Sequence, residues 1–310
     1  MSKFRSNTNL RSMGAGMLLA MLAWPVLGAE TAATFVPDFF SGVWGRNSFN
    51  FEPPPSGPAP LINLRRIGAD ANRLIVIGDP IPLVGDYNNP ILKPEAAEVV
   101  KKKGEYSASG HDFPDPSNQC AAYSPPYLFT IQLSMQMLQT KDEIVILYNQ
   151  DDQVRHVRLN DVHPAHVRPT PMGDSVAHYE GDTLVIDTVG VKVQPFTMVD
   201  RFGTPQTEAL HLVERYRLID AKEARETLER QAKTTGGGAV VADPNYSKGL
   251  RVELTIEDSN VFTTPWSANV TYTRRLGTWA DHLEQVCAEN FTDVLHQGFE
   301  HVPTADKPDF

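Results

Sequence analysis

Short β-favourable runs separated by turn residues fill the second half of this chain, and this feature restricts its fold most. The runs are Tyr127–Leu133, Gln136–Thr140, Glu143–Tyr148, Gln153–Leu159, Ser175–Tyr179, Thr183–Thr188, Ala209–Ile219, Leu250–Asp258 and Ser267–Arg275. Val252, Leu254 and Ile256 alternate with polar residues, as in a strand with one solvated face. The scarcity of long crossovers favours antiparallel pairing. We therefore expect a mainly β fold, an antiparallel meander closed into a barrel with an interior cavity; a two-sheet sandwich is the alternative.

One or two short helices interrupt this pattern. Pro94 to Lys103 has a proline at its first turn, and Gly104 follows it as a stop signal. Residues 221–248 look like an insertion, with a charged helix over 221–232 and then a glycine-rich loop. Earlier in the chain, Arg73–Ile77 is typical of a short buried strand.

The first 29 residues have the pattern of a secretory signal peptide. A positive segment is followed by an apolar stretch and by the small residues Gly28 and Ala29. The apolar stretch is shorter than the ~20 residues that a membrane-spanning helix needs. We expect cleavage, export to the bacterial periplasm or the medium, and no membrane insertion afterwards. The rest is expected to be one β domain over 30–298 with a loose tail over 299–310.

Charge excludes some partners. The chain has 28 Lys and Arg against 38 Asp and Glu, a formal net charge of −10. Signal cleavage would remove three positive charges and no acid. Nucleic-acid binding needs clustered basic residues, so we expect no nucleic-acid partner and a small-molecule ligand or substrate instead.

The two cysteines, Cys120 and Cys287, predict a disulfide, because exported proteins fold in an oxidising compartment. The bridge would close a loop of about 167 residues and stabilise the fold by roughly 4–5 kcal/mol in the chain-entropy model. A catalytic thiol or a metal pair would be the alternatives, but neither has a supporting spacing.

The densest group of polar side chains runs from Arg155 to Glu180 and suggests acid–base chemistry. His163 is the candidate general base, with Asp174 or Asp161 as the carboxylate that orients it, and Arg155 as an anion or oxyanion stabiliser. His211 is the second candidate. Its sequence neighbour Glu214 would face the other side of a strand, so we expect a cross-strand partner. Turn-capping carboxylates and solvated histidines are the structural alternative.

Two further sets of residues are candidates for binding. Four side chains are expected to rim a ligand site, namely His178, Tyr179, Trp44 and Trp266. A weaker option is a divalent-metal site whose nitrogen and oxygen ligands would come from His163, His166, Asp174 and His178. No motif for an organic cofactor is present, and none is expected.

The segment from Met172 to Gly190 reads M-G-D-S-V-A-H-Y-E-G-D-T-L-V-I-D-T-V-G. It resembles the signature G-[HD]-S-x-G-x-W-E-G-D-T-L-V-V-D-T-x-G of a large family of secreted bacterial proteins that has no single established activity. The likeness extends over roughly residues 41–292, although Ala177-His178-Tyr179 stands where Gly-x-Trp is usual. The opening Gly42-Val43-Trp44 resembles the G-x-W start of lipocalin-like barrels, which favours the barrel.

Three functions follow as hypotheses. The first is a cofactor-independent enzyme that moves a proton on a small organic molecule, of lyase, isomerase or cyclase type. The second is a lipocalin-like carrier of a small, largely apolar ligand. The third is an envelope accessory protein without a small ligand.

Overall fold

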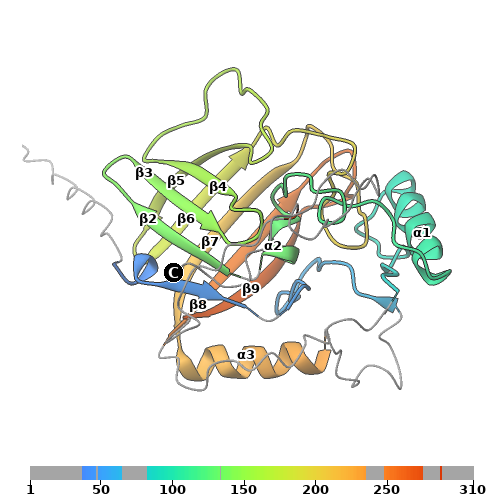
Figure 1. Cartoon of the computed structure of the whole chain (residues 1–310), viewed down its shortest axis with the longest axis horizontal. Helices are drawn as coiled ribbons and strands as arrows, with labels where there is room; N and C mark the ends of the chain where they lie inside the picture. Colours follow the sequence, from blue (N-terminus) through green and yellow to red (C-terminus); the bar gives the residue numbers. More distant parts are fainter. Residues whose placement is uncertain are drawn as a thin grey trace, which may run out of the picture. The chain divides into compact units, whose positions relative to one another are not determined.

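Nine strands close into a β-barrel in the order in which they occur along the chain (Figure 1). The computed structural model describes residues 37–46, 48–64, 82–132, 134–234, 248–274 and Cys287. The strands are β1 (Val43–Gly45), β2 (Ser134–Gln139), β3 (Glu143–Tyr148), β4 (Val154–Leu159), β5 (Asp174–Glu180), β6 (Thr183–Val189), β7 (His211–Asp220), β8 (Lys248–Glu257) and β9 (Trp266–Arg274). The helices are η1 (Pro37–Phe40, 3-10), α1 (Pro94–Ala108), α2 (Leu128–Ile131) and α3 (Ala221–Thr234). The predicted mainly β barrel is confirmed, and the sandwich alternative is wrong.

The meander departs from antiparallel pairing at one place. Every neighbouring pair of strands is antiparallel, including β1 with β9, except β4 and β5, which are parallel. A closed ring with an odd number of strands needs at least one parallel pair, because each antiparallel pair reverses the strand direction. The connection 160–173 carries the chain back along the barrel so that β5 starts at the same end as β4. This connection belongs to the polar segment from Arg155 to Glu180 and contains His163 and His166.

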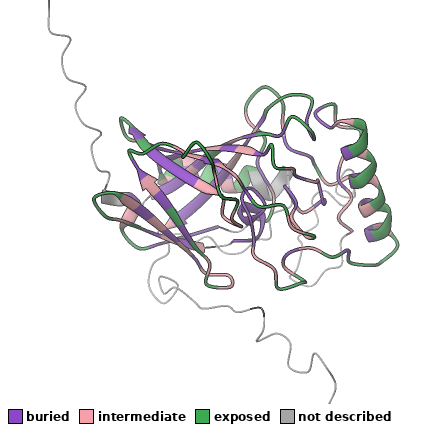
Figure 2. Cartoon of the chain, turned by 90° about the horizontal axis from the view of Figure 1, so that it is seen from above, coloured by how far each residue is buried: buried purple, intermediate pink, exposed green. Residues whose placement is uncertain are grey.

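The inward-facing residues of the barrel strands are buried, and Figure 2 colours much of these strands as buried. Inward-facing residues of β8, such as Leu250, Val252 and Leu254, have no exposed surface, and the same holds for Ile144 and Ile146 of β3. Close packing of this kind is typical of a small barrel with a side-chain core. In the described part of the barrel the expected cavity is therefore occupied by protein side chains.

A buried ion pair lies within this apolar interior. Arg155 of β4 and Glu214 of β7 are both fully buried, with 2.6 Å between guanidinium Nη2 and carboxylate Oε1. The guanidinium also donates to the hydroxyls of Ser175 and Thr188, and the Tyr216 hydroxyl donates to Glu214. Burial alone would lower the pKa of Arg155, but Glu214 outweighs it and raises that pKa. The pair connects strands on two sides of the barrel.

The helices lie outside the barrel wall. The predicted helix from Pro94 extends to Ala108 as α1, and the charged helix of the insertion is α3, which packs on the outer face of β7–β9 (Figure 1). Gly249 lets α3 approach closely, since a Cβ there would lie 2.7 Å from the Ala224 Cβ. The strand predicted over 127–133 is wrong: its centre is the short helix α2, whose four residues are all buried.

Cys120 and Cys287 form the predicted disulfide, with 5.5 Å between their Cα atoms. The bridge closes a loop of 167 residues, which contains the barrel strands β2 to β9. Among the helices in the described ranges, none has the length and apolar character to cross a membrane. The predicted signal over 1–29, the strand at 73–77, the glycine-rich loop after α3 and the tail at 299–310 lie outside the described residues.

Candidate active site on the outer face of β4–β7

The two arginines of β4 point to opposite sides of the barrel wall. Arg155 shares its side with the buried Val157 and Leu159, whereas Arg158 lies with the exposed His156 on the outer face. The alternation of a strand separates them, because their positions differ by an odd number. The prediction that Arg155 supports chemistry at His163 is therefore wrong: Arg155 lies inside the barrel, and Arg158 contacts the polar cluster.

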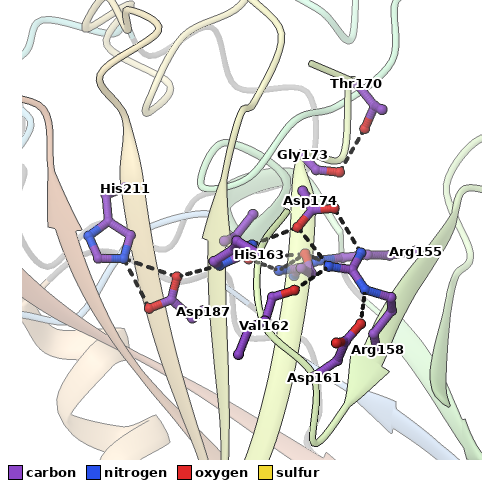
Figure 3. Close-up of polar contacts among 12 residues, drawn as sticks. Arg155, Arg158, Asp161, Val162, His163, Thr170, Gly173, Asp174, Asp187 and His211 are labelled. Atoms are coloured by element: carbon purple, nitrogen blue, oxygen red, sulfur yellow. Dashed lines mark hydrogen bonds and ion pairs between the residues drawn. The ribbon is translucent and has the colours of Figure 1, made fainter. Parts of the chain in front are cut away.

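His163 lies between two carboxylates on the outer face (Figure 3). Its Nδ1 is 2.6 Å from Asp174 Oδ1, and its Nε2 is 3.0 Å from Asp187 Oδ1. The connection 160–173 supplies the histidine, while β5 and β6 supply the two carboxylates. The structure brings His163 and Asp174 together as the sequence predicts. Both ring nitrogens of His163 are therefore engaged by carboxylates.

Asp187 also bonds His211, which extends the cluster to β7. His211 Nε2 is 3.1 Å from both carboxylate oxygens of Asp187. This contact raises the pKa of His211, and the same contact, aided by His163, lowers the pKa of Asp187. A cross-strand partner for His211 is thus confirmed. Asp187 was missed as a site residue because Val185 and Val189 share its face of β6, so the alternation does not indicate which face is buried.

Arg158 completes the cluster at its other end. Its guanidinium holds both carboxylate oxygens of Asp174, at 2.7 and 3.1 Å, and its Nε donates to Asp161 at 2.6 Å. The bond from Arg158 lowers the pKa of Asp174. Asp161 has a lowered pKa as well, first through the backbone N–H of Val162 and then through Arg158. These charge-assisted bonds fix the start of the connection 160–173 on the barrel wall.

A depression of about 440 Å³ opens beside this cluster, between β4 and the turn at 170–174. The outer face of β4 contributes His156 and Arg158 to its lining, and the turn contributes Asp174. His156 Nδ1 is 2.7 Å from Glu143 Oε1 on β3, and within the described residues no protein group bonds its Nε2. A carboxylate that holds one imidazole nitrogen leaves the other free for proton transfer. The sequence contained one signal for this pair. His156 alternates with the buried residues of β4 and so faces outward, and the preceding strand, β3, begins with Glu143.

The predicted ligand-binding residues are not brought together. Trp44 lies next to Arg274, whose guanidinium carbon is 5.2 Å from the indole centroid, at the end of β9. Trp266 begins β9, about 26 Å away at the usual rise per strand residue. Tyr179 faces inward and its hydroxyl donates to Gln139 at 2.6 Å, whereas His178 points outward. Both tryptophans are core residues.

The residues of the metal alternative are likewise dispersed. His178 contacts Glu180 at 3.2 Å, and His166 is exposed, so neither joins His163 and Asp174. In the portion of the chain covered by the structure, no three His, Cys, Asp or Glu side chains are grouped in a way that would hold a metal ion.

Comparisons of the chain with family models, with curated proteins and with solved structures found no match. The resemblance to the secreted bacterial family therefore stays a prediction.

Proposed function

We propose that this protein is an exported enzyme that moves a proton on a small organic molecule bound in the depression beside β4, without an organic cofactor. The observation that carries the proposal is the His156–Glu143 pair. One imidazole nitrogen is held by a carboxylate, and His156 lines a depression that is also lined by the guanidinium of Arg158 and the carboxylate of Asp174. Reactions of lyase, isomerase or cyclase type use such a base.

His156 is a better candidate for the base than His163. Taking up a proton at His163 would require breaking a contact to Asp174 or Asp187, since both nitrogens are engaged. In the proposal, His156 accepts and returns the proton, and Glu143 positions its ring. Arg158 stabilises negative charge on the substrate: one of its five N–H groups is left after its bonds to Asp161, Val162 and Asp174. His163 positions Asp174, a lining residue of the depression, through the bond from its Nδ1.

The carrier hypothesis is less well supported. A carrier with a ligand inside the barrel needs interior space, but the inward side chains of the described strands are buried, many of them with no accessible surface. Export to the bacterial periplasm remains part of the proposal, and a disulfide is compatible with it.

The test measures proton exchange without assuming a substrate. Purified mature protein is incubated in D2O with a metabolite extract of a Gram-negative bacterium, and deuterium uptake in each component is followed by mass spectrometry. We expect at least one component to gain deuterium faster than in a protein-free mixture. His156→Gln should slow the exchange by about 100-fold or more, because positioned general bases contribute at least that much.

His178→Gln is the matched control, since His178 is also exposed on a strand and also pairs with a glutamate, Glu180. It should exchange at the wild-type rate. Glu143→Gln should keep partial activity and change its pH profile, as expected for a positioning residue. The proposal is overturned if no component gains deuterium with wild-type protein, or if His156→Gln is as active as His178→Gln.

A further inference from the structure

A second pocket, of about 240 Å³, gathers three arginines on the outer face of the barrel. Arg215 and Arg217 come from β7 and Arg251 from β8, and Glu253 supplies the single carboxylate among the lining residues. This pocket shares no lining residue with the depression beside β4. Two carboxylates outside the lining also pair with these arginines: Glu180 with Arg215, and Glu223 with Arg251 and more distantly with Arg217. Arg217 is thus the guanidinium of the three with the weakest pairing among the described residues.

Two of these arginines are cross-strand neighbours that share one carboxylate. Arg217 and Arg251 lie directly opposite each other in the β7–β8 ladder, where like charges destabilise a sheet. One carboxylate, Glu223 of α3, serves both: it is 2.6 Å from Arg251 Nη1 but 3.6 Å from Arg217 Nη2. Apart from this ion pair, Arg217 makes no hydrogen bond within the described residues, so the N–H groups of its guanidinium are available to a ligand.

The rest of the pocket is fixed in place before any ligand arrives. Pro54 and Pro55 form one wall, with backbone angles restricted by their rings. The adjacent Glu52 is held to Asn269 of β9 by two backbone hydrogen bonds, at 2.9 and 2.7 Å. Thr183 and Asn269 add uncharged polar side chains to the lining. A preformed site loses little conformational entropy on binding.

We infer that this pocket binds a small oxyanion of the phosphate or sulfate type, free or as the ester group of a small metabolite. Guanidinium groups match such oxygens with paired N–H bonds, and two arginines from adjacent strands can clamp one anion between them. The bound charge would relieve the repulsion between Arg217 and Arg251. The inference is independent of the proposed proton-transfer site.

Isothermal titration calorimetry at low ionic strength, with inorganic phosphate and with sulfate, tests the inference. We expect saturable binding with one anion per chain. Arg217→Gln should weaken it about 10- to 100-fold, the usual effect of losing a charged hydrogen-bonding partner. Arg217→Lys should recover part of the affinity. Arg168→Gln, the same charge change at an exposed residue of the connection 160–173, should leave the binding unchanged.

A measurement on the wild-type protein tests the inference without requiring that any variant folds. In NMR spectra, phosphate should shift the side-chain Nε–H signals of Arg217 and Arg251 and leave that of Arg168 in place. Absence of saturable binding overturns the inference, and so does an equal loss of affinity in Arg217→Gln and Arg168→Gln. Binding to phosphatidylglycerol vesicles without any response to free phosphate or sulfate would also overturn it, since the bound anion would then be a lipid headgroup.

Discussion

Replacing Arg155 by methionine would leave the carboxylate of Glu214 in the barrel interior without its charged partner. In the wild-type protein Arg155 donates to both oxygens of Glu214, at 2.6 and 3.1 Å. The Tyr216 hydroxyl is the remaining donor to that carboxylate, at 2.7 Å. Both side chains of the pair have zero exposed surface. Water therefore cannot replace the lost guanidinium without opening the barrel.

The expected loss in free energy of unfolding for Arg155→Met is about 3–5 kcal/mol, the usual cost of leaving a buried charge unpaired. The double variant Arg155→Met/Glu214→Leu should be more stable than either single variant. It should lie about 1–3 kcal/mol below the wild type, because the Tyr216 hydroxyl then lacks its acceptor. The two substitutions are thus strongly non-additive.

Urea unfolding followed by circular dichroism measures these differences. Arg215→Met is the matched control, since Arg215 is the next residue along β7 from Glu214 but faces outward and pairs with the half-exposed Glu180. It should cost at most about 1 kcal/mol. Equal losses for the single and double variants, or a loss under about 1 kcal/mol for Arg155→Met, would refute the reasoning.

Three other substitutions test separate features. Asp187→Asn should lower the pKa of His211 towards its ordinary value of 6.5, as measured by NMR titration; no change would mean that the contact is absent in solution. The wild-type pair loses its stabilisation as pH rises through the raised pKa of His211 and as pH falls through the lowered pKa of Asp187, so the stability difference between the two proteins should be largest between pH 3.8 and 6.5. Replacing Cys120 and Cys287 together by serine should lower the free energy of unfolding by about 5 kcal/mol, and a loss below about 1 kcal/mol would contradict the chain-entropy argument. Gly173→Ala should cost about 1–3 kcal/mol in thermal or urea unfolding, since Gly173 has a φ of +73° and an added Cβ would lie 2.8 Å from a backbone carbonyl oxygen; unchanged stability would show that the turn relaxes freely.

Much of the fold follows from local sequence. Alternation in Val252, Leu254 and Ile256 predicts their shared buried face, and Glu180-Gly181-Asp182 predicts the hairpin between β5 and β6, where Gly181 has a φ of +64°. The disulfide follows from cysteine number and the expected compartment. These features depend on near neighbours or on composition, so a single sequence contains enough information for them.

The candidate site required the tertiary structure. The sequence places His163 and Asp174 in one polar segment, but the contact of His163 with Asp187 depends on how the connection 160–173 folds back over the barrel. The inward position of Arg155 had a local signal, its shared parity with Val157 and Leu159, yet a charged residue is predicted at the surface unless its partner is known. That partner, Glu214, is 59 residues away along the chain.

The sequence by itself determined the β class, most of the strands from β2 to β9, the two outer helices and the expectation of a disulfide, because periodicity, turn chemistry and cysteine number act locally. Only the tertiary structure decided the parallel β4–β5 pair, the filled interior and which histidine keeps a free nitrogen beside a depression. These depend on barrel closure, which brings residues from distant strands to one face and selects among the partners that each side chain has available.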